Sequence, residues 1–280
     1  MKLSDLVAAT KSRPNHSVLL YGPPKTGKTR FVGTAASLPQ VNRIFWFDGE
    51  NGVETLLHMG LSPEALEKIT LFSISDTRET PRFIETVLKA FSSKTPVAIC
   101  DAHGRINCVE CQDPKTKEFQ GELFCLQDCT HSDLIVIDSG SQLGDSALNL
   151  ACAGRPLEYK PGWDEYGLQS KWLGDILATM QAAFRTNFVM ITHVLPIEEE
   201  HNGVKKDKLY PLIGTKAFSS KVGKYFGTVI YTEIKMGKHA AGSSSTYRND
   251  AITGSRVNAV LEKSPELSMK AILVDSGIMA

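Results

Sequence analysis

Short continuous runs of apolar residues alternate with helix-like segments over the first two thirds of the chain. The runs are rich in β-branched and aromatic residues, as buried strands are, and they cover residues 17–21, 43–47, 68–74, 133–138 and 188–192. Apolar spacing between the runs predicts helices after residue 29, near residue 52, over 80–91 and over 168–184. Strands that are apolar on both faces and alternate with helices are typical of a parallel sheet covered on both sides.

The last third of the chain has a different pattern. Residues 227–235, 257–261 and 271–274 indicate antiparallel strands or hairpins at the edge of the sheet, with a Gly/Ser-rich turn at 242–245. We therefore expect an α/β fold with a mainly parallel central sheet flanked by helices and with antiparallel strands near the C-terminus. No internal repeat interrupts this pattern, so a single domain is expected over residues 1–280.

Composition narrows the classes of function. Apolar residues make up 42% of the 280 positions, which is enough for a packed core. Lys plus Arg and Asp plus Glu both number 31, so the formal charge is zero and excludes a bulk attraction to nucleic acid or to an anionic membrane. The N-terminal apolar stretch is too short for a signal peptide, and no run of about 18 apolar residues occurs. These features predict a cytoplasmic protein without a membrane partner.

Directly after the first predicted strand, residues 22–29 spell Gly-Pro-Pro-Lys-Thr-Gly-Lys-Thr, which is the P-loop pattern G-x-x-x-x-G-K-[ST]. In a strand–loop–helix context, the backbone N–H groups of this loop surround nucleotide phosphates at the start of the helix. Lys28 is expected to reach the β- and γ-phosphates, and Thr29 is expected to hold Mg²⁺. The expected ATP-binding residues of the loop are Gly22, Pro23, Pro24, Lys25, Thr26, Gly27, Lys28, Thr29 and Arg30.

Two further strands end in acidic residues. The strand over 133–138 ends at Asp138, and this is the Walker B pattern, in which the carboxylate approaches Mg²⁺ through water. The strand over 43–47 is followed by Asp48 and Glu50. Hydrolysis needs a group that orients or deprotonates water, and Glu50 is the candidate for this role. Alternatively, Asp48 or Glu50 caps the next helix.

Five of the six cysteines lie between residues 100 and 129. In a reducing compartment such clustering indicates a metal site, and two close pairs fit a tetrahedral zinc ion in a zinc-ribbon-like insertion over 100–131. The expected thiolate ligands are Cys108, Cys111, Cys125 and Cys129. Three further residues are alternative ligands. Cys100 and His103 form a rival pair, and His131 flanks the set on the other side. Four protein ligands leave no position for water, so such a zinc would be structural; a surface loop with free thiols is the other interpretation.

These features together resemble the RecA-like core ATPases over residues 15–262. Four landmarks lie at strand ends in the order of that family, namely the P-loop, Asp48-Gly-Glu50, Asp138-Ser139 and Thr192-His193. In particular the chain is similar to small phage-encoded P-loop proteins grouped with single-strand annealing or recombination. The resemblance implies Glu50 as the catalytic glutamate and His193 as a γ-phosphate sensor, although His193 also fits an ordinary surface histidine. Glu50, Lys28 and His193 are thus the expected catalytic residues, whereas the cysteine insertion departs from the family pattern.

The resemblance also implies single-stranded DNA as a partner, facing two segments of the chain. Residues 139–163 carry Arg155, Tyr159, Lys160 and Trp163, which combine phosphate contact with base stacking. Residues 195–212 hold an acidic run beside a basic run, for which a solvated loop is an equal alternative.

In the RecA-like family a Lys or Arg from a neighbouring subunit completes the active site, so a homo-oligomer, either ring or filament, is expected. The candidates for this residue are Lys235, Lys238, Arg248 and Arg256.

The sequence therefore predicts a Mg²⁺-dependent, DNA-stimulated ATPase that acts on single-stranded DNA in recombination or annealing. One alternative is a nucleotide-switched interaction protein whose zinc insertion docks a replication or recombination partner. A helicase or packaging motor subunit is another alternative. A small-molecule kinase is disfavoured because the sequence has no lid-like Arg cluster.

Overall fold

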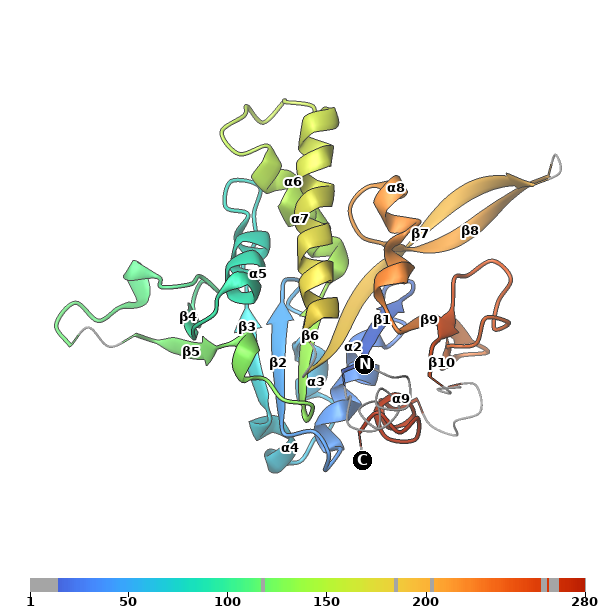
Figure 1. Cartoon of the computed structure of the whole chain (residues 1–280), viewed down its shortest axis with the longest axis horizontal. Coiled ribbons are helices and arrows are strands. Elements are labelled where there is room, and N and C mark those ends of the chain that lie inside the picture. Colours follow the sequence, from blue (N-terminus) through green and yellow to red (C-terminus); the bar gives the residue numbers. More distant parts are fainter. Residues whose placement is uncertain are drawn as a thin grey trace, which may run out of the picture.

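A mainly parallel β-sheet forms the centre of the molecule (Figure 1). The computed structural model describes residues 15–116, 119–183, 186–201, 204–257, 261 and 267–279. The strands of this sheet are β1 (Ser17–Tyr21), β2 (Arg43–Asp48), β3 (Ile69–Ser73), β6 (Asp133–Asp138), β7 (Asn187–His201), β8 (Val204–Leu212), β9 (Thr228–Lys235), β10 (Lys238–Gly242) and β11 (Gly254–Ser255). Their order across the sheet is β10-β9-β1-β7-β6-β2-β3, with β11 paired to β9 and β8 paired to β7.

Strand pairing confirms the expected α/β sheet. β1 lies between β7 and β9, and β2 lies between β6 and β3; these pairs and the β6–β7 pair are all parallel. The antiparallel pairs involve later parts of the chain, since β10 and β11 both pair with β9, and β8 pairs with β7.

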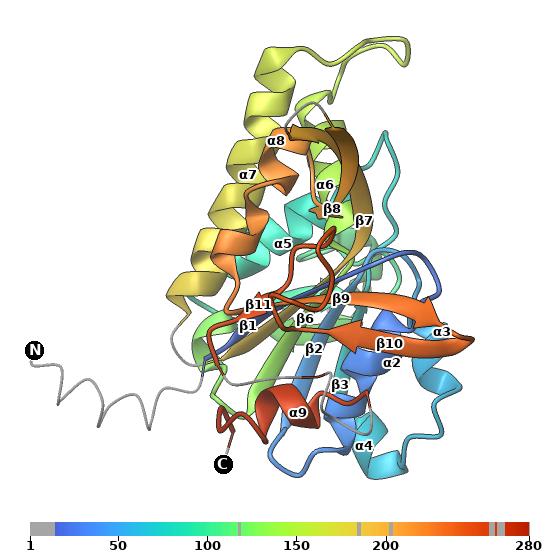
Figure 2. The same cartoon turned by 90° about the vertical axis from the view of Figure 1, so that its right-hand side faces the viewer.

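Helices cover both faces of the sheet (Figures 1 and 2). On one face, Ile135 and Ile137 of β6 share a core with α5 (Arg82–Ser92), α6 (Gly140–Ala151) and α7 (Trp163–Ala182). On the other face, Leu134 and Val136 share a core with α2 (Lys28–Gly33), α3 (Glu54–Leu57), α4 (Pro63–Glu67) and α9 (Lys270–Leu273). Because both faces are buried, the central positions of β6 are all apolar, which explains the continuous apolar run in the sequence. Within the described ranges, no helix has both the length and the apolar character needed to cross a membrane.

The expectation of a strand over 271–274 is wrong. Residues 270–273 form α9, and Ala271, Ile272 and Leu273 are all buried in the second core. A four-residue apolar run has no periodicity that separates a buried strand from a buried helical turn. Most of the other expected strand, over 257–261, lies outside the described residues.

β7 and β8 continue past the sheet as a long antiparallel hairpin, and the short helix α8 (Lys216–Ser219) follows it (Figure 1). Described residues of the segment 195–212 therefore form regular strands. Lys205 Nζ lies 2.8 Å from Glu198 Oε1, and Lys208 Nζ lies 3.9 Å from Glu199 Oε2. The acidic and basic runs thus partly neutralise each other across the hairpin.

β4 (Val97–Cys100) and β5 (Gly121–Phe124) form a separate two-stranded antiparallel sheet. The described residues between them, 101–116 and 119–120, project at the left of Figure 1 and are called the arm below. A Cβ on Gly104 of the arm would lie 2.6 Å from Ile74 Cγ1, and Thr86 Oγ1 donates a hydrogen bond to the Gly104 carbonyl at 2.7 Å. The first residues of the arm are therefore packed against the end of β3 and against α5.

His16 is buried immediately before β1. Its backbone N–H donates to Asn187 Oδ1 at 2.8 Å, and its ring Nε2 lies 2.7 Å from Thr228 Oγ1. The ring fills the space beside Gly227, where a Cβ would lie 2.5 Å from His16 Cε1. Burial, assisted by the positive charge of Arg256, lowers the pKa of His16 to about 4.

Acid should destabilise the protein through His16. The unfolded chain takes up this proton near pH 6.5, whereas the folded chain takes it up only near pH 4, so the contribution is present above pH 6.5 and is lost as the pH falls through 4. The shift corresponds to about 3 kcal/mol. In urea unfolding at pH 7 and pH 4, we expect the His16→Gln variant to lose about 3 kcal/mol less stability than the wild type. The exposed His58→Gln variant serves as the control; an acid loss in His16→Gln equal to that of the wild type would contradict this prediction.

Candidate active site and cysteine cluster

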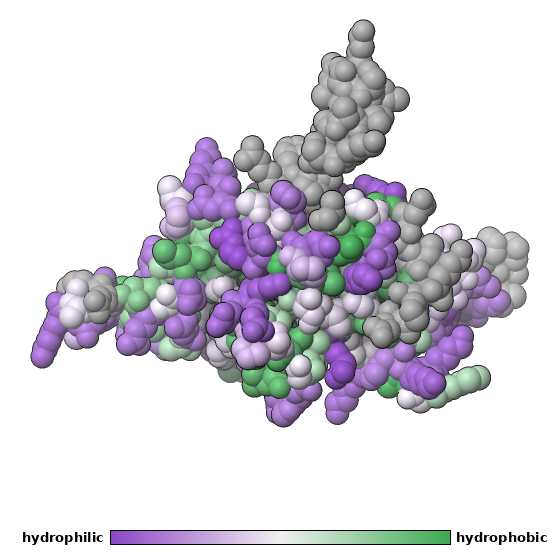
Figure 3. Space-filling model, turned by 90° about the horizontal axis from the view of Figure 1, so that it is seen from below, coloured by the Kyte–Doolittle hydropathy of each residue, from purple (hydrophilic) through white to green (hydrophobic). Residues whose placement is uncertain are grey.

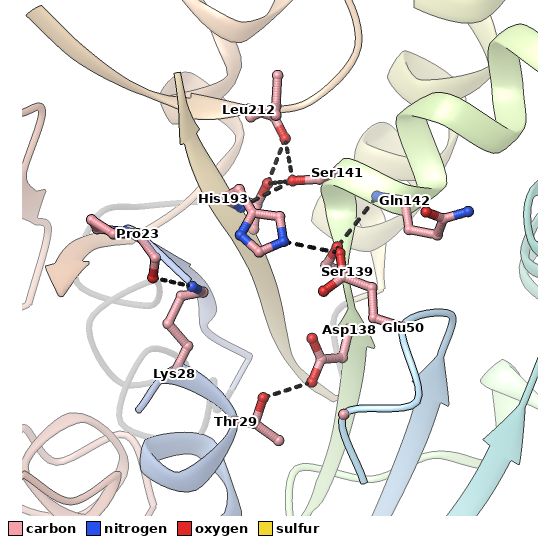
Figure 4. Close-up of polar contacts among 12 residues, drawn as sticks. Pro23, Lys28, Thr29, Glu50, Asp138, Ser139, Ser141, Gln142, His193 and Leu212 are labelled. Carbon is pink, nitrogen blue, oxygen red and sulfur yellow. Dashed lines mark hydrogen bonds and ion pairs between the residues drawn. The ribbon is translucent and has the colours of Figure 1, made fainter. Parts of the chain in front are cut away.

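The expected catalytic landmarks meet at one edge of the sheet (Figure 4). The register of β2 and β6 pairs Asp48 directly with Asp138. Since parallel strands place their carboxyl ends at the same edge, the P-loop after β1, Glu50 after β2 and His193 on β7 lie at this edge as well.

The P-loop connects β1 to α2 through two left-handed backbone positions. Lys25 has a φ of 63° and Gly27 has a φ of 85°. Residues other than glycine rarely adopt the φ of Gly27. Lys28 is buried, and its Nζ donates to the carbonyl oxygens of Gly22 at 3.1 Å and of Pro23 at 2.8 Å. The lysine thus points back into the loop, as a phosphate-binding lysine must.

Strands β9 and β10 support the P-loop from the side. Thr26 Oγ1 lies 2.7 Å from Thr232 Oγ1, and a Cβ on Gly22 would lie 2.3 Å from the Thr232 carbonyl oxygen. A Cβ on Gly27 would lie 3.2 Å from His239 Nδ1. Thr232 and His239 were not found from the sequence, because Thr232 is 206 positions from its partner Thr26 and neither residue belongs to a motif.

Thr29 and Asp138 fit the magnesium ion that the P-loop pattern implies. Thr29 Oγ1 donates to Asp138 Oδ2 at 3.0 Å. A Cβ on Gly52 would lie 3.2 Å from that carboxylate oxygen and 3.5 Å from Thr29 Oγ1, so the glycine keeps the space beside both oxygens open. Burial raises the pKa of Asp138 to about 7, with a further contribution from the charge of Asp48. Burial also lowers the pKa of Lys28 to about 8, although the charge of Asp138 opposes this. Hydroxyl and carboxylate oxygens are ligands that Mg²⁺ accepts.

Neither Asp48 nor Glu50 is the N-cap of α3, because that position is Val53 and no side chain caps it; Asp48 instead holds the loop before the helix. Its buried carboxylate accepts hydrogen bonds from the backbone N–H groups of Glu50 at 3.0 Å, Gly52 at 3.2 Å and Val53 at 3.1 Å. Asp48 therefore orders the loop after β2, and the side chain of Glu50 is left to face the P-loop edge.

Glu50 is held by two partners, His193 on β7 and Ser139 at the start of α6. Its Oε1 lies 3.2 Å from His193 Nε2 and accepts a hydrogen bond from Ser139 Oγ (Figure 4). Burial alone would raise the pKa of Glu50, but the hydrogen bonds from His193 and Ser139 and the charge of Lys28 lower it below the ordinary value. Glu50 is therefore ionised at neutral pH. Ser139 directly follows Asp138 in the sequence, and this position next to the Walker B residue is the feature from which a place for Ser139 at the site could be predicted.

His193 is fixed by its backbone as well as by Glu50. Its N–H donates to Ser141 Oγ at 2.9 Å, and Ser141 Oγ lies 2.8 Å from Thr192 Oγ1. Ser141 belongs to no motif, so this role could not be predicted from the sequence. Nδ1 of His193 is buried and has no hydrogen-bond partner among the described residues. Nε2 thus faces Glu50, whereas Nδ1 presents no exposed surface in this conformation.

A compact group of sulfur and nitrogen atoms lies at the base of the arm. Among the described residues, one ligand atom from each of four side chains lies within 4.8 Å of the other three; the side chains are those of Cys100, His103, Cys108 and Cys111. Cys108 and Cys111 were expected as ligands, and the rival pair of Cys100 and His103 completes the group.

The expected second pair of zinc ligands is corrected by this geometry. β4 and β5 are antiparallel, and their register pairs Cys100 with Gly121, so Cys125, which follows β5, lies beyond the opposite end of β4. Three strand positions separate these ends, about 10 Å at the usual rise per residue. Cys129 is buried in the main core, and burial raises the pKa of its thiol to about 12. Spacing along the sequence could not reveal this separation.

The first expected DNA-facing segment is partly helical, since α6 takes up residues 140–151 and α7 begins at Trp163. Trp163 is 94% exposed and, with Tyr166 and Lys216, lines a groove of about 640 Å³. The guanidinium of Arg155 lies 5.1 Å from the centre of the Tyr159 ring. Lys160 lies in the same connection between α6 and α7.

The late basic residues divide into two groups. Arg248 forms ion pairs at 2.5 Å with two neighbouring carboxylates, and Arg256 donates to a backbone carbonyl at 3.2 Å. Lys235 and Lys238 are exposed and lie opposite each other at the end of the β9–β10 hairpin.

Residues 14–257 match the protein family described as AAA domain. The chain belongs to the AAA domain family. The matched region of this AAA domain protein includes the P-loop, Glu50, Asp138 and His193. It is therefore an AAA-type P-loop protein, and its mainly parallel α/β sheet agrees with the fold expected from the sequence.

Two solved structures are similar to this AAA domain protein at low identity. The RadB recombinase is 18% identical, with a TM-score of 0.38, and the match covers 82% of this chain and 80% of the recombinase. A prototypical ATPase from the type III secretion system of pathogenic bacteria is 12% identical, with a TM-score of 0.42. That match covers 86% of this chain but only 57% of the secretion ATPase. No curated protein matches the sequence.

Proposed function

We propose that this AAA domain protein binds ATP with Mg²⁺ and hydrolyses it, and that Glu50 orients or deprotonates the attacking water. One observation carries the proposal. Glu50 is an ionised, partly buried carboxylate that His193 and Ser139 hold at the sheet edge where the P-loop lies. A carboxylate fixed in this way is ionised, as a group that orients water or accepts its proton must be.

The other residues of the edge neutralise charge. Lys28 Nζ, which now donates to two P-loop carbonyls, turns to the β- and γ-phosphates when ATP occupies the loop. Thr29 and Asp138 would hold Mg²⁺, which offsets negative charge on the phosphate oxygens. Residues 22–30, with Gly22, Pro23, Pro24, Thr26 and Arg30 among them, form the nucleotide-binding loop in this proposal.

His193 couples the nucleotide site to the hairpin. It contacts Glu50 through Nε2, and it lies on β7, which runs without a break from the sheet edge into the β7–β8 hairpin. A γ-phosphate that draws Glu50 or His193 to itself would change the contact between them. The strand that carries His193 then passes this change on to the hairpin.

We further propose single-stranded DNA as the polymer on which the protein acts, as the sequence resemblance to annealing and recombination proteins implies. The groove beside Trp163 supports this proposal, because it combines exposed aromatic rings with Lys216. Stacking of bases on aromatic rings and contacts of phosphates with basic residues are the usual components of such binding.

Replacement of Trp163 by Ala should weaken binding to single-stranded DNA by about 5- to 150-fold, the equivalent of about 1–3 kcal/mol for one stacked base. Fluorescence anisotropy with a labelled oligonucleotide at fixed salt measures the effect. The Leu57→Ala variant is the control, because Leu57 is also an exposed apolar residue but lies on α3, and it should bind like the wild type. Equal affinity of Trp163→Ala and wild type would remove this groove from the DNA path.

A homo-oligomer is part of the proposal, with Lys235 or Lys238 of one subunit reaching the ATP of the next. Both lysines are exposed, whereas Arg248 is already paired within its own chain. Like charges directly opposite each other cost stability, so this pair of lysines at the hairpin end is suited to an anionic partner.

Steady-state ATP hydrolysis with and without long single-stranded DNA tests the proposed function. Strong stimulation by the DNA is expected. A low rate that DNA does not change would instead support a nucleotide-switched interaction protein. Stimulation by duplex DNA together with strand separation would support a helicase or packaging motor.

A further inference from the structure

The cysteine cluster has the dimensions of a filled tetrahedral metal site. His103 Nδ1 lies 3.3 Å from Cys111 Sγ, 3.5 Å from Cys108 Sγ and 4.0 Å from Cys100 Sγ. In a regular tetrahedron around zinc, with the usual zinc–sulfur and zinc–nitrogen bond lengths, each sulfur lies about 3.5 Å from the nitrogen. The three observed distances lie around this value, and all three sulfurs share one imidazole nitrogen as neighbour.

Two of the proposed ligands, His103 and Cys100, have neighbouring groups that would stabilise their metal-bound forms. Glu110 Oε2 lies 3.6 Å from His103 Nε2, so the ring nitrogen that faces away from the sulfurs has a carboxylate partner. This arrangement orients a metal-bound histidine and makes it a better ligand. The backbone N–H of Arg105 donates to Cys100 Sγ at 3.3 Å, a contact that stabilises a thiolate.

We propose that Cys100, His103, Cys108 and Cys111 bind one structural Zn²⁺ ion at the base of the arm, with Glu110 positioning His103. Three thiolates and one imidazole in a tetrahedron favour zinc over the hard cations, which take oxygen ligands. Four protein ligands leave no site for water or substrate, so the ion has no catalytic role. The proposal is independent of the nucleotide site.

The structure also indicates what the metal does. Among the described residues of the arm, only Gly104 and Cys108 are buried, and the arm projects from the body of the molecule with both hydrophilic and apolar residues on its surface (Figure 3). Val109, between the last two cysteine ligands, is 82% exposed. A segment with so little buried apolar surface cannot hold its own fold, and metal coordination supplies the missing free energy. Through Cys100 the ion ties the arm to the end of β4.

Zinc content of the purified protein tests the ligand set. Prepared under reducing conditions without chelator, the wild type should carry one zinc per chain, and the Cys100→Ser and Cys111→Ser variants should lose most of it. Cys125→Ser is the matched control, because Cys125 also lies in the insertion but outside the cluster, and it should keep its zinc. Zinc lost from Cys125→Ser but retained by Cys100→Ser would overturn the assignment. A zinc-free wild type whose thiols all react freely would also overturn it.

A second measurement avoids variants that fail to fold. Exchange of the ion for Co²⁺ in the wild type should give the intense visible bands of a tetrahedral site and a sulfur-to-cobalt charge-transfer band. Chelator competition should show that Glu110→Gln weakens metal affinity by about 10- to 100-fold, whereas Glu122→Gln, an exposed glutamate on β5, does not. Weak octahedral cobalt bands, or equal affinities for the two variants, would contradict the tetrahedral site or the role of Glu110, respectively.

Discussion

The Glu50→Gln variant is expected to hydrolyse ATP about 10²- to 10⁴-fold more slowly than the wild type, with ATP affinity little changed. Gln keeps the length of the side chain and can still accept the hydrogen bond from Ser139, but it cannot take a proton from water. Glu50 donates nothing to the P-loop, so ground-state binding should not depend on it. Single-turnover hydrolysis together with ATP titration would separate the two effects.

Glu54→Gln is the control for this variant. Glu54 lies four positions further on, is exposed on α3 and has no place in the proposed site, so its replacement should leave the rate unchanged. If Glu50→Gln hydrolyses ATP at the wild-type rate, Glu50 is not the base, and the Glu50–His193 pair is a structural contact only.

The Lys28→Met variant is expected to be impaired in both ATP hydrolysis and ATP binding. Hydrolysis should fall by about 10²-fold or more, because the positive charge at the transferred phosphoryl group is removed. ATP binding should weaken as well, in contrast to Glu50→Gln. The fold should survive, because Lys28 is a buried cation whose pKa burial lowers to about 8, and Met preserves its packing.

Thermal unfolding and ATP titration of Lys28→Met check this combination, with Lys89→Met, an exposed lysine on α5, as the control. Unimpaired ATP binding by Lys28→Met would mean that the loop does not hold nucleotide as its sequence indicates. A large drop in melting temperature would show that Lys28 has a structural role instead.

Local signals in the sequence were the most reliable. The P-loop and the Walker B Asp are contiguous patterns attached to buried strands, and the structure brings Thr29 within 3.0 Å of Asp138 as these patterns suggest. Likewise, Cys108 and Cys111 are three residues apart and fall in the same cluster. Short spacing restricts geometry directly, so it can be interpreted without knowledge of the fold.

Features that depend on strand register could not be predicted. The partners of Cys108 and Cys111 are decided by the pairing of β4 with β5, which carries Cys125 away from Cys100. The choice between Asp48 and Glu50 depends on which side chain turns inward under the loop after β2. Thr232 reaches the P-loop only because β9 pairs with β1.

The position of β1 also affects how the protein can be made. β1 is the first described strand to leave the ribosome, but its two neighbours in the sheet, β7 and β9, begin at Asn187 and Thr228. Until those segments have been synthesised, both edges of this mostly apolar strand lack their final partners, and such a strand is prone to pair with other chains. The nascent P-loop therefore has no nucleotide site during most of translation, and chains cut short before β9 are expected to aggregate rather than bind ATP.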